Sequence, residues 1–232
     1  MGGDAMTEAE WDACYDPQKM LDFLRGRGSD RKLRLFACAA CRQAWDELTD
    51  PASRRAVQVA EHYADGLVGR AELARAAKEV PQSEWTGKEP DIFNWYLVTP
   101  TVAADMTDLR TYAWLTAEPN LPDLTPERAA ALWAEHGDRL LASDYQADLL
   151  REIVSNPFRP VALDPSWLAW NDGAIRKMAQ SVYDARAFDR LPLLADALEE
   201  AGCDNAGVLT HCRQPGEHVR GCWVVDLLLG KT

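Results

Sequence analysis

Helix-start signals recur along this chain, and they limit its fold more than any other feature of the sequence. Thr7 and Glu10 have the T-x-x-E spacing of a capping box, in which two side chains satisfy backbone N–H groups of the first helical turn. A capping residue also directly precedes proline at Asp16-Pro17, Asp50-Pro51, Thr125-Pro126 and Asp164-Pro165. Proline is well tolerated in a first turn, because the N–H that it lacks would have no partner there. Each of these pairs therefore predicts the start of a helix.

The fold class follows from these starts together with the stop signals. Gly26, Gly66 and Gly202 stand where a left-handed cap can end a helix. The sequence has no Asn-Gly or Asp-Gly hairpin signal between alternating strands. We predict an all-α protein, a multi-helix globular array, with helices at residues 7–14, 17–25, 30–48, 51–65, 70–79, 99–117, 126–136, 143–155, 173–186, 190–201, 205–213 and 219–229.

Two segments of loop composition divide these helices. Residues 80–94 are rich in Pro, Gly, Ser and Trp, and a second proline-rich stretch covers residues 118–123. We expect a leader at residues 1–5, an N-terminal helical lobe at 6–80, a looser middle segment at 81–142 and a C-terminal helical lobe at 143–232. The two lobes either share one core or fold separately, and both arrangements remain open.

The charge of the chain limits its partners. Its formal net charge is -12, from 37 acidic and 25 basic residues, so it repels phosphate backbones and anionic lipids. No apolar run approaches the roughly 18 residues that a membrane span needs. The six cysteines lack the tight spacing of a disulfide framework, and no secretory signal precedes them. We predict a cytoplasmic protein whose partner is another protein, not a nucleic acid or a membrane.

The C-terminal region concentrates the residues that can carry site chemistry. Residues 201–230 contain half of the chain's cysteines and histidines, namely Cys203, His211, Cys212, His218 and Cys222. Their spacing matches no known metal, nucleophile or phosphate motif. Cys38 and Cys41 have C-x-x-C spacing, but they fall within a predicted helix, whereas a zinc knuckle places this motif on a turn. We therefore expect no cofactor. The alternative is a zinc-stabilised domain that uses Cys38 and Cys41 with C-terminal ligands such as His211 and Cys212.

An enzyme is the other alternative. His218 and Cys222 are four residues apart, so on a helix the imidazole can reach the thiol. Asp226 lies in an almost wholly apolar segment, where a carboxylate must be paired or neutralised. An ion pair with an arginine, such as Arg220 or Arg34, is the commoner explanation for such a residue. A catalytic site would consist of Cys222, His218 and Asp226.

The sequence favours a non-enzymatic helical module that acts through protein–protein contacts. Trp85 and Trp95 lie between the helices predicted at 70–79 and 99–117, and Trp167 and Trp170 follow the turn NPFRPVALDP. Large aromatic side chains with a polar group are enriched at protein interfaces. The alternative is that these rings fill gaps between helices.

Several segments resemble one family of bacterial proteins that occurs in many copies per genome. The segments are MTEAEW at residues 6–11, DRKLRLFACAAC at 30–41, NPFRPV at 156–161, LPLLADALEEAGC at 191–203 and PGEHVRGCWVVDLLLGK at 215–231. The resemblance covers both predicted lobes and supports their boundaries. It implies no activity, because none is assigned to the family.

Overall fold

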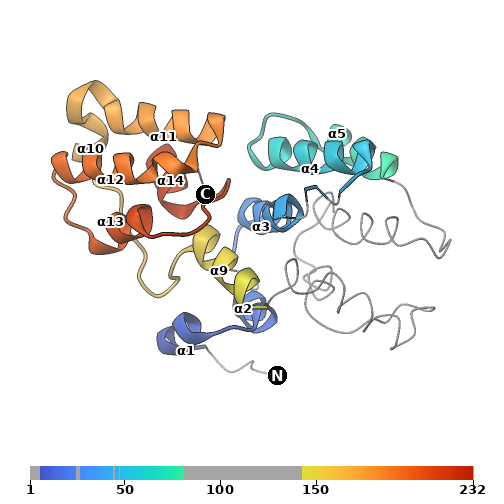
Figure 1. The fold of residues 1–232 in the computed structure, drawn as a ribbon, viewed down its shortest axis with the longest axis horizontal. Coiled ribbons are helices and arrows are strands. Elements are labelled where there is room, and N and C mark those ends of the chain that lie inside the picture. The colour runs from blue at the N-terminus through green and yellow to red at the C-terminus, as the bar shows by residue number, and fades with distance from the viewer. Residues whose placement is uncertain (1–5, 25–26, 44, 47, 81–142, 232) are drawn as a thin grey trace. The chain divides into compact units, whose positions relative to one another are not determined.

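The computed structural model describes residues 6–24, 27–43, 45–46, 48–80 and 143–231, and its regular elements in these ranges are helices (Figure 1). No β-strand occurs among the described residues, which confirms the predicted all-α class. None of the described helices is both long enough and apolar enough to cross a membrane. The helices predicted at 99–117 and 126–136, with the rest of the middle segment at 81–142, lie outside the described residues.

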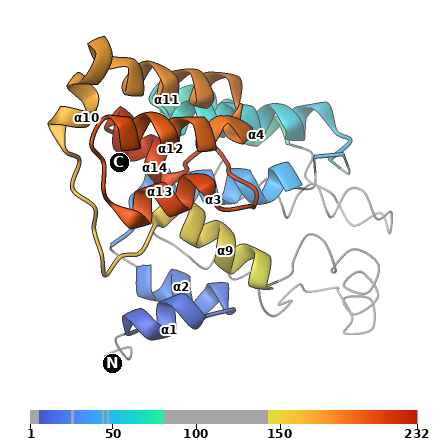
Figure 2. The ribbon, with the colours of Figure 1, turned by 60° about the vertical axis from the view of Figure 1, so that its left-hand side comes forward.

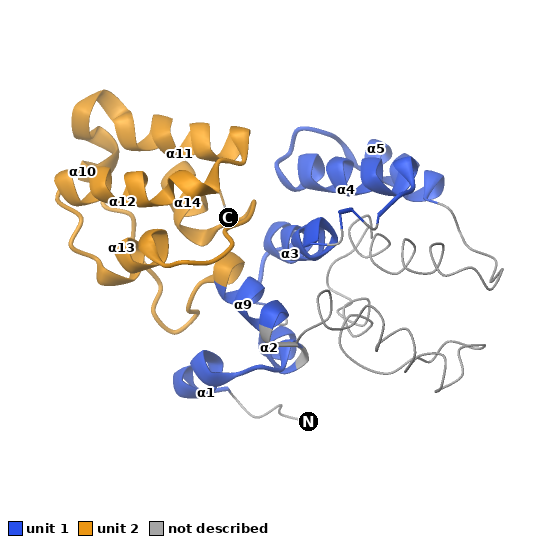
Figure 3. Cartoon of the chain, viewed as in Figure 1, with its two compact units in different colours: residues 1–151 blue, residues 152–232 orange. Residues whose placement is uncertain are grey.

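The chain divides into two compact units, residues 1–151 and 152–232 (Figure 3). The boundary falls inside helix α9 (Ser143–Val154), at whose first residue the sequence predicts the C-terminal lobe to begin. Only the last turn of α9 therefore belongs to the second unit, and this turn carries Glu152.

Three helices of the first unit start where the capping signals at Thr7, Asp16-Pro17 and Asp50-Pro51 predict. Up to residue 80 the helices of this unit are α1 (Glu8–Ala13), α2 (Pro17–Leu24), α3 (Asp30–Gln43), α4 (Pro51–Ala64) and α5 (Arg70–Glu79). Thr7 forms the predicted capping box, since its Oγ1 accepts from the N–H of Glu10 at 3.3 Å and its own N–H donates to Glu10 Oε2 at 2.7 Å. Asp50 caps α4 by accepting from the N–H of Ser53 at 2.6 Å.

Helices α3 and α4 pack against each other and bury both cysteines of the C-x-x-C pair. The thiol of Cys38 donates to the carbonyl oxygen of Val57, with an S···O distance of 3.9 Å. Beside this contact, the guanidinium of Arg42 donates to both carboxylate oxygens of Glu61, at 3.1 and 2.8 Å. The interior of this helix pair thus combines apolar packing with one bidentate ion pair.

The second unit is built around α11 (Ala174–Ala185) and α12 (Leu191–Glu200), which lie side by side in both views (Figures 1 and 2). Three shorter helices complete it: α10 (Pro165–Ala169), α13 (Ala206–Arg213) and α14 (Trp223–Leu229). Apolar side chains from all five helices form one core, which includes Trp167, Ile175, Leu194, Val208 and Val225. This core positions the ends of α13 and α14 for the site described below.

Two helix bounds differ from the prediction by more than one residue, and one short helix was not in the predicted set. The helix predicted at 30–48 ends at Gln43. The side chain of Arg54 donates to the carbonyl oxygens of Trp45 and Leu48, at 2.8 and 2.6 Å. These hydrogen bonds stabilise a turn after Gln43 in place of further helix. The last helix starts at Trp223 instead of residue 219, because Gly221 has a φ of 101°, which a right-handed helix does not allow. The Asp164-Pro165 start begins a short helix, α10, that the set of predicted helices omits.

Candidate metal centre

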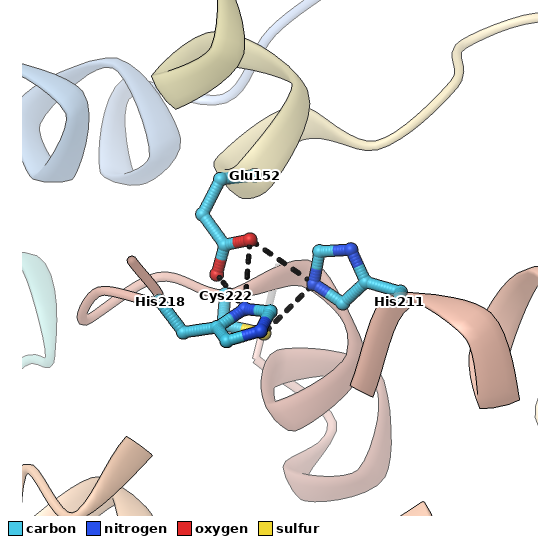
Figure 4. A group of neighbouring side chains, drawn as sticks. All are labelled: Glu152, His211, His218 and Cys222. Atoms are coloured by element: carbon cyan, nitrogen blue, oxygen red, sulfur yellow. Dashed lines mark hydrogen bonds and ion pairs between the residues drawn. The ribbon is translucent and has the colours of Figure 1, made fainter. Parts of the chain in front are cut away.

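Four side chains of the second unit converge on one point (Figure 4). Glu152 comes from the last turn of α9, and His211 from the last turn of α13. His218 lies in the connection between α13 and α14, and Cys222 is the N-cap residue of α14. Each residue offers one ligand atom, and these atoms all lie within 4.8 Å of one another.

The contacts inside the group are close to the spacing of ligands that share a metal ion. Glu152 Oε2 lies 3.0 Å from Nδ1 of His218 and 3.1 Å from Nε2 of His211. The same Nε2 of His211 lies 3.3 Å from the sulfur of Cys222. Zinc bonds of about 2.0–2.3 Å place two ligand atoms of a tetrahedral site about 3.3–3.6 Å apart. The remaining ligand atoms lie within 4.8 Å of one another, so movements of about 1 Å would bring the four atoms to the spacing of a tetrahedral site.

The group is withdrawn from solvent. The side chains of Glu152, His211 and His218 are 6%, 9% and 7% exposed, and Cys222 is 0% exposed. Burial acts to raise the pKa of Glu152, but hydrogen bonds and charge interactions with the two histidines outweigh it, so this pKa lies below its ordinary value. Burial, followed by the nearby charge of Glu152, raises the pKa of the Cys222 thiol well above its ordinary value. In the absence of a cation, the group therefore combines a carboxylate with a protonated thiol.

One ring nitrogen in the group has no hydrogen-bond partner in the structure. This atom is Nε2 of His218, and it is buried. The second histidine is held from outside the group, since Nδ1 of His211 lies 3.4 Å from the side-chain nitrogen of Gln214.

The local sequence explains how the histidine and the thiol reach this point. On α13, Val208, His211 and Cys212 are spaced i, i+3 and i+4, so they share a face, and all three are buried. Val208 and Cys212 join the apolar core, which leaves His211 at its edge. The positive φ of Gly221 reverses the chain immediately before Cys222, and the N–H of Cys222 donates to the carbonyl oxygen of Val219 at 2.9 Å.

His211 is not placed as the base of a cysteine-nucleophile triad, and His218 has Glu152 at Nδ1 but no hydrogen-bonded thiol at Nε2. In a nucleophile–base–acid triad the acid holds one ring nitrogen of the base and the nucleophile contacts the other. Here Glu152 and Cys222 both contact Nε2 of His211. Moreover, Asp226 is buried on α14 and is not a member of the group, so Glu152 is the carboxylate beside His218 and Cys222.

Of the four residues predicted to bind a metal, His211 belongs to the group, whereas Cys38, Cys41 and Cys212 do not. The group also contains His218 and Cys222 from the predicted catalytic set. Cys212 points into the apolar core, where burial and then the charge of Glu152 raise its pKa to about 12. Cys38 and Cys41 belong to the first unit and are not members of the group.

The tryptophans predicted to form a contact surface are described only in part. Trp85 and Trp95 lie outside the described residues. Trp167 is 6% exposed and belongs to the core, which favours the alternative that its ring fills a gap between helices. Trp170 packs against the same core but is only partly buried.

Glu152 was not among the residues predicted for the site, although the sequence contains a signal for it. Glu152 follows Tyr145 and Leu149 at helical spacing and precedes the buried Ile153. An acidic residue on the apolar stripe of a helix is expected to be buried and therefore to need a partner. Its partners lie 59 and 66 residues away, and helical periodicity does not identify them.

The chain matches no protein-family model, no curated protein and no solved structure.

Proposed function

We propose that the second unit is a zinc-binding helical module in which Glu152, His211, His218 and Cys222 hold one Zn²⁺ ion in a structural site. The observation that carries this proposal is the convergence of four ligand atoms of three chemical types within 4.8 Å of one another. This is the zinc alternative considered from the sequence, with a different set of ligands. Cys38, Cys41 and Cys212 have no part in it.

The donor set favours zinc over other common divalent ions. A thiolate and two imidazoles suit Zn²⁺, whereas Mg²⁺, Ca²⁺ and Mn²⁺ prefer sites made of oxygen atoms. The charges also balance, because the carboxylate of Glu152 and the thiolate of Cys222 together offset the two charges of the ion. Neutrality matters here, since the side chains are withdrawn from water and an unbalanced buried charge is costly.

Burial favours a structural role over a catalytic one. Structural zinc sites have four protein ligands, whereas catalytic sites keep one position open for water or substrate. The group supplies four ligands, and each of the four side chains is less than a tenth exposed. Because the metal binds the folded unit and not the unfolded chain, its binding free energy adds to the stability of the fold.

Cobalt substitution tests the proposal. Co²⁺ bound at this site should produce visible absorption typical of tetrahedral coordination and a near-ultraviolet thiolate-to-cobalt charge-transfer band. Cys222→Ser should abolish the charge-transfer band. Cys14→Ser is the matched control, because Cys14 is a half-buried thiol of the first unit that donates to the carbonyl oxygen of Asp16. Retention of the band in Cys222→Ser would exclude Cys222 as a ligand.

A structural zinc site would be compatible with a module that binds another protein. The protein partner and the cytoplasmic location remain predictions from composition and charge.

A further inference from the structure

Three of the four proposed ligands lie in one short stretch of chain, from His211 to Cys222. Between α13 and α14, residues 214–221 form no helix or strand. We call these residues the 214–221 segment. Its first four residues are exposed, so the beginning of the segment contributes little apolar packing to the unit.

The backbone around the 214–221 segment has hydrogen bonds near its two ends. The N–H of Gln214 donates to the carbonyl oxygen of Thr210 at 2.8 Å, and the N–H of Cys222 donates to that of Val219 at 2.9 Å. Between them, Gly216 has a φ of 152°, and a Cβ atom built on it would meet nothing within 4 Å. The middle of the segment is therefore open to solvent.

His218 connects this segment to α9 through its contacts with Glu152. Its Nε2 atom is buried without a hydrogen-bond partner in the structure, so the closed position costs desolvation free energy. A metal ion would offset that cost by joining His218 to three other ligands. The closed position of the segment should thus depend on the ion.

The core of the second unit does not depend on the segment in the same way. The buried apolar cluster runs from Trp167 to Leu229 over α10, α11, α12, α13 and α14, and it contains Cys222 but neither His211 nor His218. Most of this burial would survive if the segment opened. Regions held by few apolar contacts open locally at lower free energy than the core that supports them.

We propose that Zn²⁺ acts as a latch on the 214–221 segment. This proposal rests on the proposed zinc site. With zinc bound, the segment is held against the last turn of α9. Without zinc, the segment opens while α11 and α12 stay folded. Zinc thus controls the exposure of one surface segment of the unit.

Limited trypsin digestion followed by mass spectrometry tests the latch, because Arg220 provides a cleavage site inside the segment. Arg220 is half-buried, and its guanidinium lies 4.6 Å from the ring centre of Tyr183. We expect cleavage between Arg220 and Gly221 to be at least tenfold faster in chelator-treated protein than in zinc-loaded protein. Cleavage after Arg176 and Lys177, which are exposed on α11, should be equally fast in both samples.

Two variants complete the test. His218→Ala should be cleaved rapidly after Arg220 with or without zinc, and His218→Gln serves if the alanine variant does not fold. His62→Ala is the matched control, because His62 is an exposed histidine on α4 of the first unit, and it should keep the protection by zinc.

The possible failures are distinguishable when zinc content is measured on the same samples. Equal cleavage after Arg220 in zinc-loaded and chelated protein would contradict the proposed control of the segment by zinc, but it would not contradict the zinc site. Faster cleavage on α11 after chelation would also contradict this control, since zinc would then hold the whole unit. Wild-type protein that binds no zinc would overturn the zinc site itself.

Discussion

The carboxylate of Glu152 lies 3.0 Å from Nδ1 of His218, although the two residues are 66 positions apart in the sequence. This contact joins the last turn of α9 to the connection between α13 and α14. It also places a full negative charge beside two imidazoles and a thiol in a region withdrawn from water. A divalent cation would balance these groups.

Glu152→Gln should weaken zinc binding while the protein stays folded. The amide keeps the size of the carboxylate, but it removes a charged oxygen ligand, so we expect the dissociation constant for zinc to rise about 100-fold or more. Competition with a chromophoric chelator measures this change. Glu200→Gln is the control, because Glu200 is an exposed carboxylate at the end of α12 in the same unit. An unchanged affinity in Glu152→Gln would remove Glu152 from the ligand set.

Cysteine alkylation at neutral pH should label Cys14 first. Cys14 is half-buried, whereas the other cysteines are buried: Cys38, Cys41, Cys203, Cys212 and Cys222. Burial raises the pKa of Cys212 to about 12, so this thiol is almost entirely protonated and unreactive at neutral pH. In chelated, folded protein, Cys222 should also react slowly, because burial raises its pKa well above the ordinary value. Time-resolved mass spectrometry measures the order, and rapid labelling of Cys222 in folded protein would restore the nucleophile hypothesis.

Arg42→Ala should destabilise the first unit strongly. It removes the bidentate partner of Glu61, whose side chain is 3% exposed, and leaves a buried carboxylate without that cation. Breaking one side of a buried pair costs about 3–5 kcal/mol. Arg55→Ala is the control, because Arg55 and Glu79 are 3.6 Å apart with side chains 55% and 40% exposed, and such pairs contribute about 0–1 kcal/mol. Urea unfolding compares the two variants, and equal losses of unfolding free energy would contradict the role assigned to Arg42.

The helices were predictable because their signals are local. The capping box at Thr7 and the capped proline at Pro51 act within one helical turn, and the structure starts α1 and α4 there. The end of α3 was not predictable in the same way, since it depends on hydrogen bonds from Arg54, which lies in the next helix. The start signals of α1 and α4 lie within the helix itself, whereas the end of α3 depends on a contact from another helix.

The candidate site was predictable only in part. The concentration of cysteine and histidine near the C-terminus made His211, His218 and Cys222 candidate site residues, and all three belong to the group. The choice between Cys212 and Cys222 depends on which side chain faces the core and which faces the group, and this is a property of tertiary packing. Glu152 joins the group through a contact across 66 residues, for which the sequence has no spacing rule.

Zinc content per chain is the most direct test of the proposed site. Protein produced without a histidine tag in zinc-supplemented medium should contain about one zinc per chain by elemental analysis. The His218→Ala and Cys222→Ser variants should contain much less, while His62→Ala should match the wild type. Wild-type protein that remains folded, contains no zinc and takes up none on dialysis against Zn²⁺ would contradict the central claim.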